Sequence, residues 1–291
     1  MKVIRRIKRI IRGNVRTDVL ENADPKKWRE HLFGLTPERW NSLSGKAFWI
    51  TGAGTGYGRS ISCALAAAGA KVFFTGRRKA KIQESIEEIK SFGISAENCF
   101  IVDADITDPE QVRSACGRVM SHCGSLSGLV NNAALSEKLS KPFQEGSLGY
   151  WNRMMATNVT APFFLTKAAF PHMMKSGHVR VLFISSGAGW ASTPGFGIYN
   201  VSKAALNSLA QSMAKEYADH YPDADIQMNV VSPGEARTEM NQGSDISPYS
   251  IASIALLLLS HPKNGPNGKF FARDGAHLEF CHTKPYGRPL S

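Results

Sequence analysis

The chain has 291 residues, of which 43% are hydrophobic and 20% are charged, and its formal net charge at pH 7 is +11. This length and composition are typical of a soluble globular protein, and they exclude disordered and collagen-like classes. The five cysteines form no CxxC or Cys/His cluster, so we predict neither a disulfide framework nor a zinc site and expect reduced thiols in a cytoplasmic protein.

The net charge is concentrated at the N-terminus. The acid-free first sixteen residues hold seven of the cations, which are Lys2, Arg5, Arg6, Lys8, Arg9, Arg12 and Arg16. Residues 1–13 place apolar side chains at helical spacing between cations, which predicts a basic amphipathic helix, too short and too charged to span a membrane. Three interpretations stay open: contact with an anionic membrane surface, packing on the domain or a partner subunit, and an organelle presequence.

Residues 17–44 are polar, and Pro25 and Pro37 interrupt them. This pattern predicts a pair of short helices joined by turns. We therefore assign residues 1–44 to an N-terminal extension and residues 45–291 to one domain.

From Gly45 onward, short runs of β-branched and aromatic residues alternate with helical segments. The predicted strands lie within residues 46–52, 71–76, 98–105, 125–134, 178–186, 224–234 and 269–276. This alternation predicts a single α/β domain with a Rossmann-like, doubly wound parallel sheet of about seven strands and helices on both faces. Ligands are expected at the carboxyl ends of the strands.

The segment TGAGTGYG, residues 51–58, lies between the first strand and the next helix. Glycines there let the backbone turn tightly and approach a pyrophosphate, whose charge would meet the helix N-terminus. A purely structural turn is the alternative, because the spacing departs from G-x-G-x-x-G. In its context the segment resembles the TGxxxGxG signature of short-chain dehydrogenases/reductases. The resemblance implies cofactor contacts from Gly52, Thr55, Gly56, Tyr57 and Gly58.

Further segments resemble the same family in the same order along the chain. An adenine-edge pair follows the third strand, and NNAA follows the fourth, with Ala134 in place of the glycine of NNAG. A PG segment follows the sixth strand, and a DG pair follows the last. The resemblance implies cofactor contacts from Asp105, Ile106, Asn132, Ala133, Pro233, Gly234 and Thr238.

The end of the second strand bears on the choice of cofactor. Residues 71–83 contain no Asp or Glu, and Arg77 and Arg78 stand where an acid would hold the ribose 2′-hydroxyl of NAD. The planar fork of arginine suits a 2′-phosphate. A merely solvated helix start is disfavoured, because cations are unfavourable at the positive end of a helix dipole. We predict NADP(H) in preference to NAD(H), with Arg77 favoured over Arg78.

The segment IYNVSK places Tyr199 and Lys203 four residues apart, on one face of a helix. A fixed ammonium near a phenol is expected to lower the pKa of Tyr199, so that it can exchange a proton with a carbonyl or alcohol oxygen. For an isolated pair, ordinary helix surface would be the alternative.

Two further residues match the catalytic positions of the same family. Ser186 ends a predicted strand thirteen residues before Tyr199 and matches the serine that holds the substrate oxygen, with Ser185 as runner-up. Asn158 matches a helix asparagine that anchors a water beside the lysine in relatives. The resemblance implies a tetrad of Asn158, Ser186, Tyr199 and Lys203, of which Tyr199 and Lys203 also contact the cofactor.

We therefore predict an NADP(H)-dependent oxidoreductase that interconverts a carbonyl and an alcohol by hydride transfer, without a metal. Tyr199 would be the general acid/base, assisted by Lys203 and Ser186. The alternatives are a catalytically silent scaffold or regulator of the same fold, an NAD-dependent dehydrogenase, and a nucleic-acid binder acting through the basic N-terminus. No nucleic-acid-binding signature accompanies that N-terminus, so we expect no nucleic-acid partner.

The segment after Thr238 reaches the next predicted helix within about ten residues, which makes a short lid over the cleft. Our hypothesis is therefore a bulky or carrier-linked substrate, with a simple small molecule as the alternative. Trp190, Phe196 and residues 135–143 are expected to line its pocket, ordinary loop packing being the alternative. The family resemblance implies a homo-oligomer, a dimer or tetramer, in the cytoplasm, with contact to a membrane surface through residues 1–13 as an open addition.

Overall fold

The computed structural model describes residues 23–136, 143–191 and 194–279 of the chain. The amphipathic helix predicted within residues 1–13 lies outside the described residues. Within them, no helix is both long and apolar enough to cross a bilayer.

The described strands form one open sheet in the order β3-β2-β1-β4-β5-β6-β7-β8. They are β1 (Ala47–Thr51), β2 (Lys71–Thr75), β3 (Cys99–Ile101), β4 (Gly128–Asn131), β5 (Val179–Ile184), β6 (Ile226–Ser232), β7 (Phe270–Ala272) and β8 (His277–Leu278). Neighbouring strands from β3 to β7 are parallel, which confirms the predicted doubly wound sheet. The prediction missed β8, which pairs antiparallel with β7 and is too short to show a periodic pattern.

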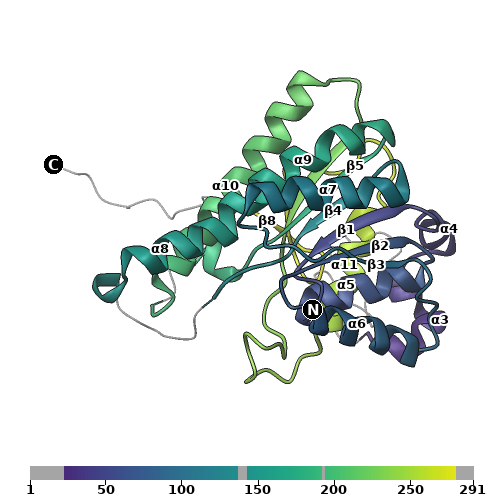
Figure 1. Ribbon diagram of the computed structural model, residues 1–291, viewed down its shortest axis with the longest axis horizontal. Coiled ribbons are helices and arrows are strands. Elements are labelled where there is room, and N and C mark those ends of the chain that lie inside the picture. Colours follow the sequence, from purple (N-terminus) through teal and green to yellow (C-terminus); the bar gives the residue numbers. More distant parts are fainter. Residues whose placement is uncertain (1–22, 137–142, 192–193, 280–291) are drawn as a thin grey trace, which may run out of the picture.

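Helices cover both faces of the sheet, as predicted (Figure 1). The longer ones are α5 (Gly56–Ala67), α6 (Lys79–Ser91), α7 (Pro109–Cys123), α8 (Leu148–Met155), α9 (Ala161–Lys175), α10 (Gly197–His220) and α11 (Ala252–Leu259). In Figure 1, α5, α6 and α11 lie on one side of the sheet and α7, α9 and α10 on the other, while α8 extends away from the sheet. A π-helical turn at Ala156–Thr160 joins α8 to α9.

The two faces of the sheet follow from the alternation of side chains along each strand. In β1, Phe48 and Ile50 belong to the core beneath α5 and α11, while Trp49 belongs to the core beneath α7, α9 and α10. All five residues of β1 are buried, as expected of a central parallel strand covered on both faces. The uninterrupted apolar run in the sequence therefore has a simple structural cause.

The described part of the predicted N-terminal extension packs on the core of the domain. It contains α3 (Trp28–His31) and α4 (Pro37–Asn41), with 3₁₀ turns at Pro25–Lys27 and Leu32–Gly34. Phe33 and Leu43 are fully buried, and the Trp28 indole N–H donates a hydrogen bond of 3.3 Å to the Phe92 carbonyl after α6. Residues 23–43 thus contribute to the packing beneath α5, α6 and α11.

Candidate active site

A cavity of about 990 Å³ opens at the carboxyl ends of the strands. Neighbouring strands β1 and β4 lead away to opposite edges of the sheet, which is the switch point where α/β folds bind ligands. The predicted site residues that line this cavity are Gly52, Thr55, Gly56, Tyr57, Arg77, Arg78, Asp105, Ile106, Asn132, Ala133, Ser186, Tyr199, Lys203, Pro233, Gly234 and Thr238. Gly58 and Asn158 lie behind its wall.

The glycine-rich turn between β1 and α5 is a close-packed backbone cradle. Gly52 and Gly56 have φ angles of 65° and 53°, which favour glycine. A Cβ on Gly58 would lie 2.3 Å from the Gly52 carbonyl oxygen, so Gly58 is needed for packing although it does not line the cavity. Thr55, at the N-cap of α5, makes no side-chain capping hydrogen bond. The first N–H groups of α5 are therefore suited to bind an anion.

Side chains from neighbouring segments hold this turn in place. The Asn132 amide donates to the Thr51 carbonyl at 2.9 Å, and the Thr51 hydroxyl accepts from the backbone N–H groups of Asn132 and Ala133, each at 3.1 Å. The Tyr57 hydroxyl donates to the Gly234 carbonyl at 2.9 Å. The turn, the end of β4 and the Pro-Gly segment therefore form one connected wall of the cavity.

The sequence analysis missed Arg59, which fixes the turn from behind. Its Nε and Nη2 atoms donate to the Gly54 carbonyl at 3.1 and 2.7 Å. Its Nη1 atom donates to Glu88 at 2.7 Å, and Glu88 in turn accepts from the Tyr249 hydroxyl at 2.9 Å. Arg59 directly follows the last glycine of the motif, but its partner Glu88 lies 29 positions further along the chain, where spacing carries no signal.

We expect Arg59→Met to weaken the binding of NADPH by about 10-fold, because charge-assisted hydrogen bonds that orient the turn are lost. Arg59→Lys keeps the charge but not the fork, so an intermediate loss is expected. Fluorescence titration of folded variants measures both, with the exposed helix residue Arg113, changed to Met, as the control. An unchanged affinity in folded Arg59→Met would contradict the positioning role.

Arg77 and Arg78 follow β2 and are exposed at the edge of the cavity. The Arg78 guanidinium forms an ion pair of 2.7 Å with the carboxylate of Glu239, another residue that the sequence analysis missed. Asp105 faces the same end of the cavity, and one of its carboxylate oxygens accepts from the Thr107 backbone N–H and hydroxyl at 3.0 and 2.7 Å.

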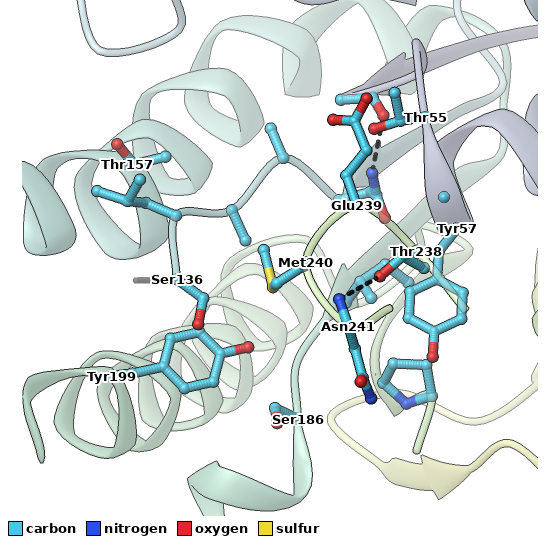
Figure 2. A pocket seen from close by; sticks show the side chains of 18 of the residues that line it. Thr55, Tyr57, Ser136, Thr157, Ser186, Tyr199, Thr238, Glu239, Met240 and Asn241 are labelled. Carbon is cyan, nitrogen blue, oxygen red and sulfur yellow. Dashed lines mark hydrogen bonds between the residues drawn. The ribbon is translucent and has the colours of Figure 1, made fainter. Parts of the chain in front are cut away.

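Tyr199 and Lys203 lie on α10 at the other end of the cavity. Their side chains are 8% and 2% exposed. The Lys203 ammonium is 5.7 Å from the centre of the Tyr199 ring and donates to the Ile184 carbonyl at 2.9 Å. Figure 2 shows Tyr199 and Ser186 on one side of the cavity, Tyr57 and Thr238 on the other, and Met240 between them in this view.

Burial decides the protonation of this pair. Burial raises the pKa of Tyr199, and a hydrogen bond with Ser186 opposes the rise. Burial also lowers the pKa of Lys203 to about 7. The prediction that the ammonium would lower the phenol pKa is therefore wrong here, because the loss of solvation disfavours the charged form of both groups and outweighs their attraction.

The two candidate serines differ in their surroundings. Ser186 is partly exposed to the cavity, and its hydroxyl accepts from the Ala188 backbone N–H at 3.2 Å. The Ser185 hydroxyl is buried and has no hydrogen-bond partner in the described part of the chain. Both residues line the cavity, but only the Ser186 hydroxyl opposes the rise in the pKa of Tyr199. The geometry therefore favours Ser186 over Ser185.

Asn158 lies in the π-helical turn between α8 and α9, a distortion often found at functional sites. Its side chain accepts from the Leu135 backbone N–H at 2.7 Å and donates to the Leu135 carbonyl at 2.9 Å. It also donates at 3.0 Å to the hydroxyl of Ser202, which directly precedes Lys203 on α10. Asn158 thus links the segment after β4 to α10. Its expected relation to a water beside Lys203 stays a prediction.

The expected substrate end carries several apolar side chains beside polar ones. Leu135, Ser136 and Phe196 line the cavity near Tyr199, and Met240 joins them from the opposite side. Trp190 does not line it: its ring packs edge-on against Phe270 at 5.8 Å, and its N–H donates to the Glu279 carbonyl. The expectation for Trp190 is therefore wrong, because β7 and β8 draw this ring toward the sheet edge. Within the described ranges, no cluster of His, Cys, Asp and Glu is placed to hold a metal ion.

Comparisons with known proteins agree with this geometry. Residues 46–247 match the sequence profile of the short chain dehydrogenase family. The chain is 31% identical to the 11-beta-hydroxysteroid dehydrogenase 1A of Arabidopsis thaliana over 206 residues, which are 71% of this chain but only 56% of that protein.

Solved structures show the same fold. A short-chain type dehydrogenase/reductase from Mycobacterium marinum superposes with a TM-score of 0.71 at 28% identity, over 82% of this chain and 98% of that one. A metagenomic short-chain oxidoreductase in complex with NADP has a TM-score of 0.67 at 28% identity, over 77% and 95% of the two chains. The strand order, the glycine turn at the switch point and the matched profile lead to one conclusion: this chain belongs to the short chain dehydrogenase family.

Proposed function

We propose that this protein is an NADP(H)-dependent oxidoreductase that interconverts a carbonyl and an alcohol. The observation that carries the proposal is the single cavity that joins the uncapped N-terminus of α5 to Tyr199, Ser186 and Lys203. In this arrangement an anion-binding helix end and a proton-donating group face the same space.

The cavity fits a nicotinamide dinucleotide. A Cβ on Gly52 would come within 2.8 Å of the Asn132 amide, so the turn can pack against the end of β4 only with glycine at this position. The glycine turn and the start of α5 would hold the pyrophosphate, Asp105 and Ile106 the adenine, and Pro233, Gly234 and Thr238 the nicotinamide end. Arg77 and Arg78 would meet a 2′-phosphate. When bound, the cofactor supplies or accepts a hydride.

The residues at the α10 end would handle the proton. Because burial raises the pKa of Tyr199, its phenol is protonated at neutral pH and can donate to a carbonyl oxygen. The Ser186 hydroxyl would hold the same oxygen and stabilise charge that develops on it. Lys203, with a pKa of about 7, can carry or release a proton in this buried space.

We further propose a bulky or carrier-linked apolar substrate. Phe196 and Met240 line the cavity near Tyr199 and remain 47% and 40% exposed, so apolar surface there awaits a partner. One relative named above is a steroid dehydrogenase. The exposed apolar side chains of Phe196 and Met240 suit a substrate with a similarly large apolar surface. Apart from Lys203, the charged lining residues lie at the glycine-turn end and on the segment after Gly234.

The remaining parts of the proposal concern assembly and location. We propose a homo-oligomer in the cytoplasm, in line with the family resemblance, and a catalytic domain that begins near residue 45. Contact of residues 1–13 with a membrane surface stays a prediction. Size-exclusion chromatography with light scattering, and vesicle sedimentation with anionic lipid, measure the two.

Cofactor titration tests the function directly. We expect NADPH to bind at least about 10-fold more tightly than NADH, as a charge-assisted contact to the 2′-phosphate requires. Arg77→Ala and Arg78→Ala should each weaken NADPH with little effect on NADH, and Lys79→Ala is the matched control, because this neighbouring cation does not line the cavity. A panel of bulky and small ketones, followed by the absorbance of the reduced cofactor, then tests turnover.

Each alternative has a distinct result. Equal affinity for NADPH and NADH would contradict the cofactor preference, and binding of neither would contradict the oxidoreductase. Cofactor binding without turnover of any ketone would favour the silent scaffold.

A further inference from the structure

The negatively charged side chain of Glu239 lies next to Arg78, one of the two arginines proposed to bind a 2′-phosphate. Its carboxylate lies 2.7 Å from Nη2 of Arg78, and the two side chains are 47% and 61% exposed. Both residues line the cavity at its glycine-turn end. The contact joins two segments 161 positions apart, the end of β2 and the segment that follows the Pro-Gly pair.

The backbone holds Glu239 at this position. Thr238 and Asn241 exchange backbone hydrogen bonds of 3.0 and 3.1 Å, which close a tight turn around Glu239 and Met240. The Arg237 N–H donates to the Ile246 carbonyl at 2.8 Å. The Thr238 side chain packs at the glycine turn, where a Cβ on Gly56 would meet it at 3.1 Å. The carboxylate is therefore carried by a structured turn that lies against the proposed pyrophosphate site (Figure 2).

Three other charged side chains nearby already have partners of their own. Lys81 pairs with Glu84 at 2.8 Å, and Arg59 pairs with Glu88 at 2.7 Å. Asp105 accepts from Thr107, on its own loop. Of the acids that line the cavity in the described part of the chain, Glu239 is the one that forms an ion pair with an arginine of the segment after β2.

We propose that Glu239 is a specificity-determining residue. Its carboxylate pairs with the Arg78 guanidinium where the 2′-phosphate would bind, so this ion pair must break or shift when NADP(H) binds. The inference rests on the proposed function, because it assumes that Arg78 faces the 2′ position of the nucleotide. A carboxylate and a phosphate within a few ångströms of one guanidinium repel each other. The Glu239 carboxylate therefore weakens NADP(H) binding relative to NAD(H) and narrows the preference that the arginines create.

Two small nucleotides isolate the effect, because 2′,5′-ADP differs from 5′-AMP only by the 2′-phosphate. We expect Glu239→Gln in the full chain to tighten 2′,5′-ADP by about 3- to 10-fold, the size of one partly screened charge contact, and to leave 5′-AMP within about twofold. The same tightening should appear for NADPH and not for NADH. It should shrink as salt is added, because the charges are exposed.

Two further variants separate a local contact from a general charge effect. Glu235 lines the cavity on the same segment as Glu239, but it forms no ion pair with Arg78. Glu235→Gln should therefore tighten the binding of 2′,5′-ADP less than Glu239→Gln does. In an Arg78→Ala background, Glu239→Gln should change 2′,5′-ADP binding by less than about twofold, since the shared guanidinium is gone.

The results separate this inference from the function on which it rests. Unchanged or weaker 2′,5′-ADP binding by Glu239→Gln overturns the inference, and so does equal tightening of 5′-AMP. In both cases a wild-type chain that binds NADPH leaves the proposed function intact. A wild-type chain that binds neither NADPH nor NADH overturns both.

Discussion

Tyr199→Phe is expected to lower kcat for carbonyl reduction by about 10²- to 10⁴-fold, the range typical of a lost general acid. The ring stays and only the hydroxyl is removed, so the buried packing of the Tyr199 ring with Ile198 and Met154 is kept. Binding of NADPH should change far less than kcat does, by about threefold at most, because the hydroxyl is one cofactor contact among many whereas it is the proton donor to the substrate oxygen. Steady-state kinetics with a ketone that the wild type reduces, together with cofactor titration, measures both.

A second tyrosine on the same helix is the control. Tyr217 packs against Phe170 with ring centres 4.3 Å apart, far along α10 from the cavity. Tyr217→Phe should therefore retain kcat. If Tyr199→Phe keeps more than about a tenth of the wild-type kcat, the general-acid role of Tyr199 is wrong.

Lys203→Met is expected to abolish most turnover and, at the same time, to raise the free energy of unfolding. Turnover falls because the buried cation beside Tyr199 is lost. Stability rises because a pKa of about 7, against the ordinary 10.5 of lysine, means that burial of the ammonium costs a few kcal/mol at neutral pH. Loss of the hydrogen bond to Ile184 offsets part of this gain, so we expect about 1–3 kcal/mol net.

The pH dependence identifies the lysine as the cause. Folding lowers the pKa of Lys203, so between about pH 7 and pH 10.5 the unfolded chain binds more protons at this position than the folded chain does. The wild type therefore gains stability as pH rises through that window, because Lys203 loses its charge. Below about pH 7 the full cost of burying the charged ammonium is present. Urea unfolding of both proteins over the window should show the advantage of Lys203→Met shrinking as pH rises. If the difference in unfolding free energy between the two proteins stayed constant with pH, burial of the Lys203 ammonium could not be its cause.

A destabilising lysine in a buried cavity is best understood as a functional feature. Residues that are costly to the fold tend to concentrate where chemistry requires them. The same reasoning applies to the exposed Phe196 and Met240, which a purely structural role would have buried.

Much of the fold could be predicted from local patterns. The strands of the sheet are short apolar runs such as residues 47–51, and their alternation with helices is enough to predict parallel pairing. The two-residue β8 was missed because a strand so short has no period. The relation of Tyr199 to Lys203 was also predictable, because four positions in a helix place two side chains on one face whatever surrounds them.

Local spacing could not predict the features that depend on distant parts of the chain. Arg59 reaches Glu88, Arg78 meets Glu239, and Trp190 turns toward Phe270, because the fold brings together segments far apart in the sequence. Protonation at Tyr199 was misjudged for the same reason. Attraction between neighbouring charges can be inferred from spacing, but the loss of solvent depends on everything that covers them.

By itself, then, the sequence determined the strand and helix pattern, the glycine turn and the residues that share one face of α10. Each of these follows from backbone geometry within a few residues. Only the tertiary structure decided which arginine orients the glycine turn, which acid opposes Arg78 and in which direction burial moves the pKa of Tyr199. The physical reason is that burial, solvation and ion pairing belong to the packed molecule, whereas periodicity belongs to the chain.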